Sequence, residues 1–426
     1  MAVVPPGTLL RKKAAVTDLS TLLVMEMKIV FIAPFGLRPK GTVTARMIPL
    51  AAGLNRLGHD VVVVAPPYTN PEDSGRVETV RGVTVRNIVL GPANRALAAP
   101  LLAWRLFRAV MAEKPNLVHL FKPKGYGGLA VMLMVCCGRL GIRMPRLFLD
   151  CDDWEGRGGM NELHDYSLPE RYLYSFQEKW LSSRMQGLTV ASRMLAESFR
   201  ETAPGLKLLY LPNCVEDRPP GDGRSVRRRL GIPDDAPVLL LYTRFFEFSQ
   251  DRLHHLFAEL YRRLPGLRLL VVGTGRKGEE KLLEDFAAEK GFRDALLMAG
   301  WIEPAEIPDY LAAGDVAVYP FADTLVNRAK CPAKLTELLR AGLPVVADRV
   351  GQIPEYFAPE LHRLLCEPDS WDEMATKCEE LLLDASKRRW SSSLGREFIL
   401  GNYSWKDHVE LLHGFYLKHA NVNKAP

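Results

Sequence analysis

The chain repeats one pattern along most of its length: a short unbroken apolar run, then a longer stretch whose apolar residues recur with helical spacing. The first apolar run is KIVFIAP (28–34), the helical stretch is TARMIPLAAGLNRLGHD (44–60), and the next apolar run is VVVVAP (61–66). An apolar run without alternating polar residues is typical of a strand buried on both faces of a parallel sheet. Parallel strands need a helical crossover, so the pattern predicts βαβ units with right-handed connections.

The pattern is interrupted once. Residues 214–237, CVEDRPPGDGRSVRRRLGIPDDAP, are dense in Pro, Gly and charge, as is typical of a linker between domains. The apolar runs restart at VLLLYTR (238–244), and a single core stops growing at roughly 250–300 residues. We predict two doubly wound, Rossmann-like α/β domains at 27–214 and 215–395, followed by C-terminal helices at 396–426 that pack back on the first domain. Residues 1–26 are expected to be a flexible extension or a start assigned too early.

The composition narrows the class of protein only a little. A net charge of +6 fits acidic small molecules, an anionic membrane surface or nucleic acid, and it also fits plain solubility. The seven cysteines form no C-x-x-C pair, which argues against a disulfide framework and a zinc site. No apolar run reaches the roughly 18 residues of a spanning helix. We therefore expect a reducing, cytoplasmic protein without a metal site.

Doubly wound sheets bind ligands at the carboxyl ends of their strands, so residues that directly follow a strand are the first candidates. PFGLRPKGTVTAR (34–46) follows the first strand, and Gly36 and Gly41 allow tight turns and close approach of the backbone to a ligand. The helix that begins after this loop favours an anion at its N-terminus. The loop has neither the Walker A order nor G-x-G-x-x-G, so a structural turn and a ligand loop are equally good interpretations.

A group of acids follows a second predicted strand in LDCDDWEGRGG (149–159). Four acids, Asp150, Asp152, Asp153 and Glu155, cluster with Trp154 there. Carboxylates accept hydrogen bonds from sugar hydroxyls, and an aromatic face stacks on a sugar ring. The same oxygens could hold a divalent cation, and a solvated acidic loop is the plainest alternative.

A pair of lysines follows another strand, in HLFKPKGYGG (119–128). Lys122 and Lys124 are candidate cations at the end of that strand. His119, inside the strand, is more typical of a satisfied core side chain than of a catalyst.

In the second domain, Arg244 ends the first strand, and VVGTG (271–275) brings Gly273 and Gly275 to the end of the next one. Arginine suits phosphate because its planar fork can bind two oxygens. The alternative for Arg244 is a structural ion pair with Glu247 or Asp251.

The segment PAKLTELLRAGLPVVAD (332–348) predicts a helix, a sharp stop and a buried strand. Lys334 and Glu337 lie three residues apart, on one face of the helix. An exposed pair would contribute only about 0.3–0.5 kcal/mol. Alternatively this face lines a cleft, where Lys334 and the helix N-terminus meet phosphate and Glu337 accepts the hydroxyls of a ribose. The helix alone fits both interpretations.

These residues together resemble a known family. VVGTG…LLMAGWIEPAEIPDYLAAGDVAVYPF…PAKLTELLRAGLPVVADRVGQIPEYF (271–357) is similar to the C-terminal domain of glycosyltransferase family 4, the retaining enzymes of the GT-B fold. The opening βαβ segment and SWKDHVELLHGFY (404–416) also resemble that family. The likeness covers about residues 27–418 and implies two Rossmann-like domains that face a central cleft.

The resemblance implies transfer of a sugar from a nucleotide-sugar donor to a hydroxyl of a glycan, lipid or lipid-linked acceptor, with retention and without a metal or cofactor. We assign catalytic roles to Arg244, Lys334 and Asp152. The expected donor-binding residues are Gly36, Gly41, Gly273, Gly275, Lys330 and Glu337. The expected acceptor-binding residues are Lys122, Asp153, Trp154 and Glu155.

The sequence departs from the family pattern at three positions. Ala329 stands where the family often has a second Glu, as in a subset that carries Pro-x-Lys before the ribose-binding Glu. Ser249 and Gln250 stand where a basic partner of the arginine is usual, and Phe121 stands where a His is expected at a strand end. These departures keep a non-catalytic nucleotide- or sugar-binding relative as the alternative function.

Other classes of protein fit less well. A dehydrogenase with two Rossmann-like domains predicts G-x-G-x-x-G, which neither domain shows. Nucleic-acid binding would want a concentrated basic face, whereas RSVRRRL (224–230) is short and is interpreted as a solvated linker. We also formulate the hypothesis of peripheral contact with an anionic membrane, at its inner face, as an alternative to plain helix packing. It rests on arginines among apolar residues: Arg95, Arg105, Arg108, Arg139, Arg143 and Arg146.

Overall fold

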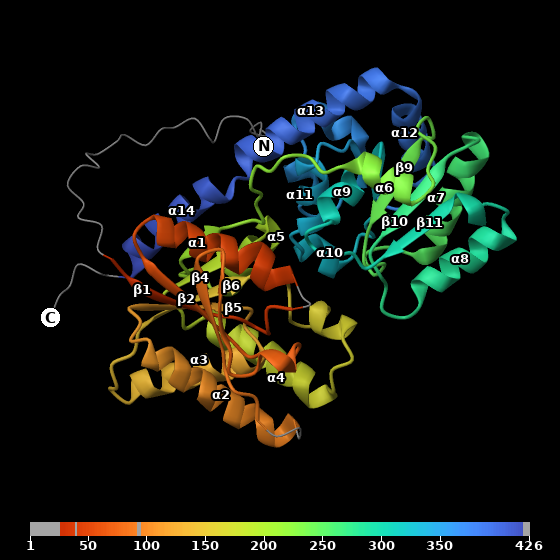
Figure 1. Ribbon diagram of the computed structural model, residues 1–426. Coiled ribbons are helices and arrows are strands. Elements are labelled where there is room, and N and C mark those ends of the chain that lie inside the picture. The colour runs from red at the N-terminus through yellow and green to blue at the C-terminus, as the bar shows by residue number, and fades with distance from the viewer. Residues whose placement is uncertain (1–25, 39–40, 92–94, 421–426) are drawn as a thin grey trace, which may run out of the picture.

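The computed structural model describes residues 26–38, 41–91 and 95–420, without the side chains of residues 95–97. The described chain forms two α/β lobes, each built around its own sheet (Figure 1). The extension expected at residues 1–26 lies, apart from its last residue, outside the described residues. So does the side chain of Arg95.

The first lobe contains an eight-stranded sheet within the described residues, in the order β3-β4-β2-β1-β5-β6-β7-β8. All neighbouring strands pair in parallel except β3 and β4, which form an antiparallel hairpin. The strands are β1 (Lys28–Ile32), β2 (Asp60–Ala65), β3 (Val77–Val80), β4 (Val83–Asn87), β5 (Leu117–Phe121), β6 (Arg146–Cys151), β7 (Gly187–Val190) and β8 (Leu208–Tyr210).

Helices cover both faces of this sheet, as the predicted crossovers require (Figure 1). The first of them begins as a π-helical turn, a geometry that is rare and recurs at functional sites. The helical segments are η1 (Val43–Met47), α1 (Ile48–Arg56), η2 (Pro71–Asp73), α2 (Arg95–Ala112), α3 (Gly125–Arg139), η3 (Met160–Leu163), α4 (Leu168–Ser182) and α5 (Arg193–Thr202).

The second lobe contains a fully parallel sheet in the order β11-β10-β9-β12-β13-β14. Its strands are β9 (Val238–Tyr242), β10 (Arg268–Val272), β11 (Leu296–Gly300), β12 (Val316–Tyr319), β13 (Val345–Asp348) and β14 (Leu365–Cys366). Its helical segments are α6 (Gly223–Arg229), α7 (Gln250–Arg263), α8 (Glu279–Glu289), η4 (Arg293–Ala295), α9 (Ile307–Ala312), α10 (Leu325–Ala329), α11 (Ala333–Arg340), η5 (Ile353–Tyr356), η6 (Pro359–Leu364) and α12 (Trp371–Leu383).

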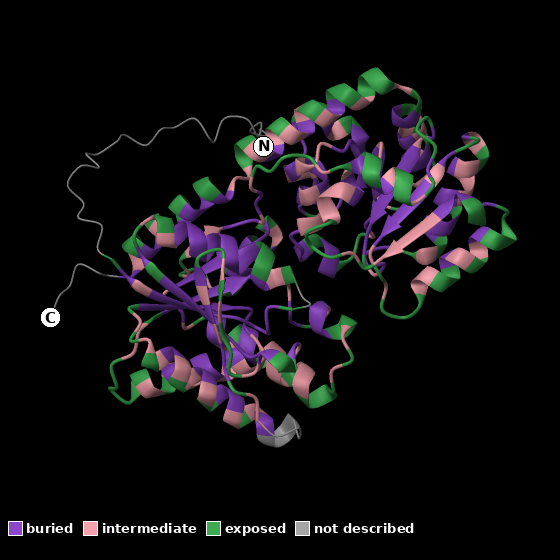
Figure 2. Ribbon diagram, in the orientation of Figure 1, coloured by how far each residue is buried: buried purple, intermediate pink, exposed green. Residues whose placement is uncertain are grey.

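Both sheets are buried in the centre of their lobes, while polar helix faces form the surface (Figure 2). One cluster of buried apolar side chains fills the second lobe, and two further clusters lie on the two faces of the first sheet. The unbroken apolar runs of the sequence are the strands of these cores. The predicted doubly wound architecture is therefore confirmed in both lobes.

The interpretation of RSVRRRL as a solvated linker is wrong. Residues 223–229 form α6, and an added Cβ at Gly223 would lie 2.1 Å from the carbonyl oxygen of Ala312, so this helix packs closely on α9. Arg227 donates to Asp315 at 2.8 Å and to the carbonyl of Ala313 at 2.9 Å. The charge-rich sequence is typical of a linker, yet it forms a docked helix in which Arg227 and Arg229 make local contacts.

Two helices close the described chain and contact different lobes. α13 (Ala385–Asn402) packs along α11 and α12 of the second lobe, and α14 (Trp405–His419) packs against α1 of the first lobe. Val409 of α14 fits over Gly53 of α1, where an added Cβ would lie 2.5 Å from the valine side chain. Among the described residues, no helix combines the length and apolar character that a membrane crossing requires.

Candidate active site

A cavity of about 980 Å³ lies between the two lobes, where the carboxyl ends of both sheets meet. Segments that follow β1, β5 and β6 line it from the first lobe, and segments that follow β9, β10, β11 and β12 line it from the second. This is the position that doubly wound sheets use for ligands.

The lobes are joined beside this cavity by a short chain of hydrogen bonds. Buried Arg46 of η1 binds both oxygens of Asp150 at 2.6 and 2.9 Å, and it also donates to Asn213 Oδ1 at 3.3 Å. Asn213 in turn donates through Nδ2 to the carbonyl of Cys331 at 2.9 Å and through its backbone N–H to Cys331 Sγ at 3.0 Å. Cys331 lies between Lys330 and the start of α11. This chain of hydrogen bonds therefore ends at the segment of the second lobe that carries Lys330 and Lys334.

Arg244 lies two residues after the end of β9 and lines the cavity. Its predicted alternative, an ion pair with Glu247 or Asp251, is not found among the described residues. Glu247 instead binds Lys330 at 2.7 Å, with both side chains buried. The guanidinium of Arg244 lies over the ring of Phe246, 5.1 Å from its centroid. The residue between them, Phe245, has a left-handed backbone (φ 65°), a strained conformation that is common at functional sites.

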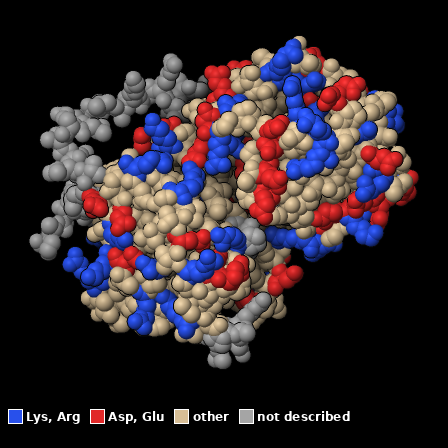
Figure 3. Space-filling model, viewed as in Figure 1, with Lys and Arg blue, Asp and Glu red and all other residues tan. Residues whose placement is uncertain are grey.

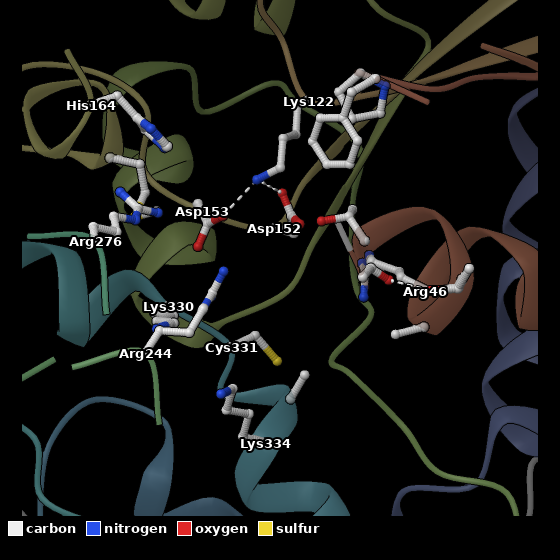
Figure 4. A pocket seen from close by; sticks show the side chains of 18 of the residues that line it. Arg46, Lys122, Asp152, Asp153, His164, Arg244, Arg276, Lys330, Cys331 and Lys334 are labelled. Carbon is white, nitrogen blue, oxygen red and sulfur yellow. Dashed lines mark hydrogen bonds and ion pairs between the residues drawn. The ribbon is translucent and has the colours of Figure 1, made fainter. Parts of the chain in front are cut away.

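Lys334 and Glu337 occupy the first turns of α11 and face the cavity (Figure 4 shows Lys334). Lys334 Nζ lies 4.1 Å from the centroid of the Tyr242 ring. Burial, with the neighbouring charge of Arg244, lowers the pKa of Lys334 to about 7. Burial raises the pKa of Glu337, although a hydrogen bond with the Tyr242 hydroxyl acts in the opposite direction. Of the two interpretations that the sequence left open, the structure shows the cleft-lining one.

The two glycines of VVGTG differ in their surroundings. Gly273 lines the cavity with φ 115°, and an added Cβ would lie 2.0 Å from the Thr243 carbonyl oxygen, so glycine is required there. Gly275 does not line the cavity, and its N–H donates to Glu280 at 2.6 Å.

The two glycines of the loop after β1, Gly36 and Gly41, also differ in their surroundings. Gly41 lines the cavity two residues before η1. Gly36 is buried and does not line the cavity, and an added Cβ there would lie 1.7 Å from Asn70 Oδ1. Gly36 thus has a packing reason of its own.

The acids after β6 surround Lys122 on the opposite wall (Figure 4). Lys122 Nζ lies 2.7 Å from Asp152 and 2.5 Å from Asp153. Burial raises the pKa of Asp152. For Asp153 burial acts in the same direction, but the Lys122 charge and hydrogen bond outweigh it and lower the pKa. Lys122 itself has a left-handed backbone (φ 66°), so both walls place a strained residue beside their charged groups.

Glu155 and Trp154 are less available to a ligand than the sequence predicts. Glu155 lines the cavity but is only 1% exposed, and its carboxylate is already paired with Lys124 at 2.5 Å. Trp154 donates its ring N–H to the carbonyl of Arg157 at 3.0 Å and does not line the cavity.

Several cavity residues were not predicted. Tyr68 and Tyr126 form an edge-on pair, as do Tyr166 and Tyr174, and Lys124 lies 5.5 Å from the Tyr166 ring centroid. These tyrosines come from three segments far apart in the sequence, so only the aromatic richness of residues 166–174 was a usable signal. Arg276, one residue beyond VVGTG, was also missed. The described residues contain no group of ligands suited to a metal ion.

The fold and the cleft define a GT-B protein. Among solved structures, the sucrose-phosphate synthase from Thermosynechococcus elongatus has a TM-score of 0.73 at 18% identity, covering 92% of this chain and 99% of that one. Alr3699/HepE of Anabaena, in complex with UDP and glucose, has a TM-score of 0.68 at 18% identity, covering 92% and 100%. At such identities the likeness concerns the fold alone.

Family models match both lobes: "Glycosyl transferase 4-like domain" over residues 41–214 and "Glycosyl transferases group 1" over residues 223–397. The chain belongs to this family of glycosyltransferases, family 4. It is 28% identical over 238 residues to a GDP-mannose-dependent alpha-(1-6)-phosphatidylinositol monomannoside mannosyltransferase of Mycolicibacterium smegmatis. That match covers 53% of this chain and 62% of the relative, less than two thirds of its length.

The pKa of Lys334 provides a direct test of the cation-bearing wall. Lysine-selective NMR should show one ammonium that loses its proton near pH 7, well below ordinary lysines, and the signal should be absent in Lys334→Arg. Because a neighbouring positive charge disfavours protonation, Arg244→Ala should raise this pKa. A Lys334 that titrates with the other lysines, or one indifferent to Arg244, would contradict the described geometry.

Proposed function

We propose that the chain transfers a sugar from a nucleotide-sugar donor, bound mainly by the second lobe, to a hydroxyl of an acceptor bound by the first lobe. The observation that carries this proposal is the joint position of Arg244, Lys334 and Glu337 on one wall of the inter-lobe cavity. Two cations and a helix N-terminus suit a diphosphate. A carboxylate a few residues further along the same helix suits the two hydroxyls of a ribose.

The end of β11 offers the place for the base. Trp301, Ile302 and Pro304 line the same cavity, and Trp301 is 53% exposed. A flat apolar surface of this kind suits a nucleobase, although it does not choose between uracil, guanine and adenine. The donor would then extend from the end of β11, past Glu337 and Lys334, to Arg244.

The chemistry needs no nucleophile from the protein. The bond between the anomeric carbon and the diphosphate oxygen breaks, and its electron pair leaves with the nucleoside diphosphate. The acceptor oxygen forms the new bond on the same face, and its proton passes to a diphosphate oxygen, so atoms and charge balance. Arg244, Lys334 and the N–H groups of α11 meet the charge that develops on the leaving group. Preorganised donors of this kind contribute about 3–4 kcal/mol each.

The acceptor is proposed to bind against the first lobe, where Asp152, Asp153 and Lys122 face the second lobe's cations. Asp152 would accept a hydrogen bond from the attacking hydroxyl and orient it. The tyrosine rings described above supply flat surfaces on which a sugar or cyclitol ring could stack. The acceptor of the Mycolicibacterium relative is a phosphatidylinositol mannoside, which supports a lipid or lipid-linked acceptor here.

Arginines and apolar side chains on α2, at the end of α3 and in the segment from α3 to the start of β6 support the hypothesis of peripheral membrane contact. Trp104, Leu140 and Ile142 are exposed by 48%, 81% and 52%. The same segments also expose Arg108, Arg139, Arg143 and Arg146. Arg105 is different, since it donates to the carbonyls of Val89 and Leu90 and so fixes a loop. On the face shown in Figure 3, acids and bases are mixed over both lobes, which favours a local contact over a broad basic surface.

A nucleotide panel tests the proposed donor. UDP-, GDP- and ADP-sugars are added singly to the full chain, and the thermal midpoint is recorded; at least one should raise it. Glu337→Ala should weaken that binding about 10- to 100-fold, because hydrogen bonds to a charged group contribute about 1.5–3 kcal/mol. Glu360→Ala, an exposed acid on the same lobe, is the matched control. No response to any nucleotide would reject the proposed donor and favour a different ligand.

Vesicle flotation tests the membrane contact separately. The chain should float with vesicles that contain anionic lipid, and added salt should release it because exposed charges are screened. It should not float with purely zwitterionic vesicles. Arg108→Glu together with Arg143→Glu should abolish flotation without altering the thermal response to the donor. Binding that is absent, or insensitive to both salt and these substitutions, would reject the contact.

A further inference from the structure

Arg276 lies on the loop between β10 and α8 and lines the cavity. Its guanidinium carbon lies 4.9 Å from the centroid of the Phe246 ring, and that of Arg244 lies 5.1 Å from the same centroid. Lys330 Nζ lies 4.4 Å from it. Three cationic groups therefore lie within about 5 Å of the centroid of one aromatic ring, and all three residues line the cavity. Figure 4 shows Arg276, Arg244 and Lys330 together on one side, across from Lys122 and Asp153.

The three cations differ in whether an acidic side chain is paired with them. Lys330 is paired with buried Glu247 at 2.7 Å. Neither Arg244 nor Arg276 makes an ion pair with any residue in the described part of the chain. The hydrogen bond of the Arg276 side chain is a long one, 3.3 Å to the carbonyl oxygen of Leu163 in the first lobe. Two uncompensated guanidiniums thus share one ring, an arrangement that repels until an anion joins them.

The acids nearest to Arg276 in sequence do not neutralise its side chain, because they bind the backbone of its loop. Glu279 accepts the N–H groups of Arg276 and Lys277 at 2.9 and 2.6 Å, and Glu280 accepts that of Gly275 at 2.6 Å. Hydrogen bonds within residues 275–280 therefore hold the loop in place. Its backbone is fixed while the Arg276 side chain extends over Phe246 toward the cavity.

The segment after β9 contributes only one cation of its own to this wall. Arg252, the next arginine after Arg244, is buried and binds both oxygens of Asp348 at 2.6 and 2.8 Å. It is fully used in the core of the second lobe. A second guanidinium that could bind an anion beside Phe246 must therefore come from another segment. Among the described residues that line the cavity, Arg276 is in that position.

We propose that Arg276 and Arg244 clamp the diphosphate of the donor between them, with Phe246 as their shared platform. This inference rests on the proposed function. A diphosphate in a nucleotide sugar carries two negative charges and offers oxygens on both phosphorus atoms, which matches two planar forks. When the sugar leaves, one further negative charge develops on the diphosphate. Arg276 therefore contacts the leaving group directly and acts in both donor binding and transfer.

Calorimetric titration of the full chain with UDP, GDP and ADP, and with the matching free nucleosides, tests this role. Arg276→Ala should weaken binding of the preferred diphosphate about 10- to 100-fold and leave nucleoside binding unchanged, while Arg276→Lys should restore part of the loss. Lys277→Ala is the matched control, an exposed cation one residue along the same loop and outside the cavity lining. Its diphosphate affinity should equal that of the wild type.

The outcomes separate this inference from the proposed function. If the wild type binds none of the three diphosphates, the proposed function fails, and this inference fails with it. If the wild type binds one of them and Arg276→Ala binds it equally well, the proposed function stands and the clamp is overturned; Arg276 then serves another anion, such as one on the acceptor. An equal loss of nucleoside affinity would also overturn the clamp, since it would indicate a disturbed loop.

Discussion

The arrangement of the cleft depends on the buried chain of contacts from Asp150 through Arg46 and Asn213 to Cys331. Arg46 belongs to the first helix of the first lobe, whereas Cys331 lies two residues before α11 of the second. Because Arg46 is 2% exposed and binds both Asp150 oxygens, its position is fixed by a strong charged pair in the core. Loss of one partner of such a buried pair costs about 3–5 kcal/mol. The same link sets where Lys330 and Lys334 lie relative to the first lobe.

The charges across the cleft follow from this arrangement. The first lobe presents Asp152 and Asp153 around a single central cation, Lys122. The second presents Arg244, Arg276 and Lys334 with no ion pair to the described residues, and only Lys330 has a close acid. Burial first, and then the neighbouring charge of Arg244, depress the pKa of Lys334, so keeping this ammonium charged in the site has a cost. A ligand with two negative charges would remove that cost, which a neutral sugar alone would not do.

Much of the fold could be predicted because unbroken apolar runs have few alternatives to buried parallel strands. The β3–β4 hairpin was missed because the prediction relied on unbroken apolar runs, whereas these two strands alternate in polarity. Arg81 and Gly82 have positive φ in their turn. α6 was missed because its charged sequence is typical of linkers, although tertiary contacts make it a docked helix.

Cavity-lining residues could be predicted where they lie just after a strand, as Arg244 does, or in the first turn of a helix, as Lys334 does. The prediction was weaker for residues whose position depends on loop packing. Trp154 turns toward the carbonyl of Arg157, and Gly36 is required by Asn70 rather than by the cavity. Arg276 stands in RKGEE, a stretch that reads as an ordinary solvated turn. Only the three-dimensional structure shows that its guanidinium shares a ring with Arg244.

The most direct measurement of the central claim is a crystal structure of the chain with a bound nucleoside diphosphate. The account predicts that both ribose hydroxyls lie within about 2.6–3.2 Å of the Glu337 carboxylate and that the diphosphate contacts Arg244 and Lys334. A nucleotide bound outside the inter-lobe cavity, or bound inside it with Glu337 turned away from the ribose, would contradict the account.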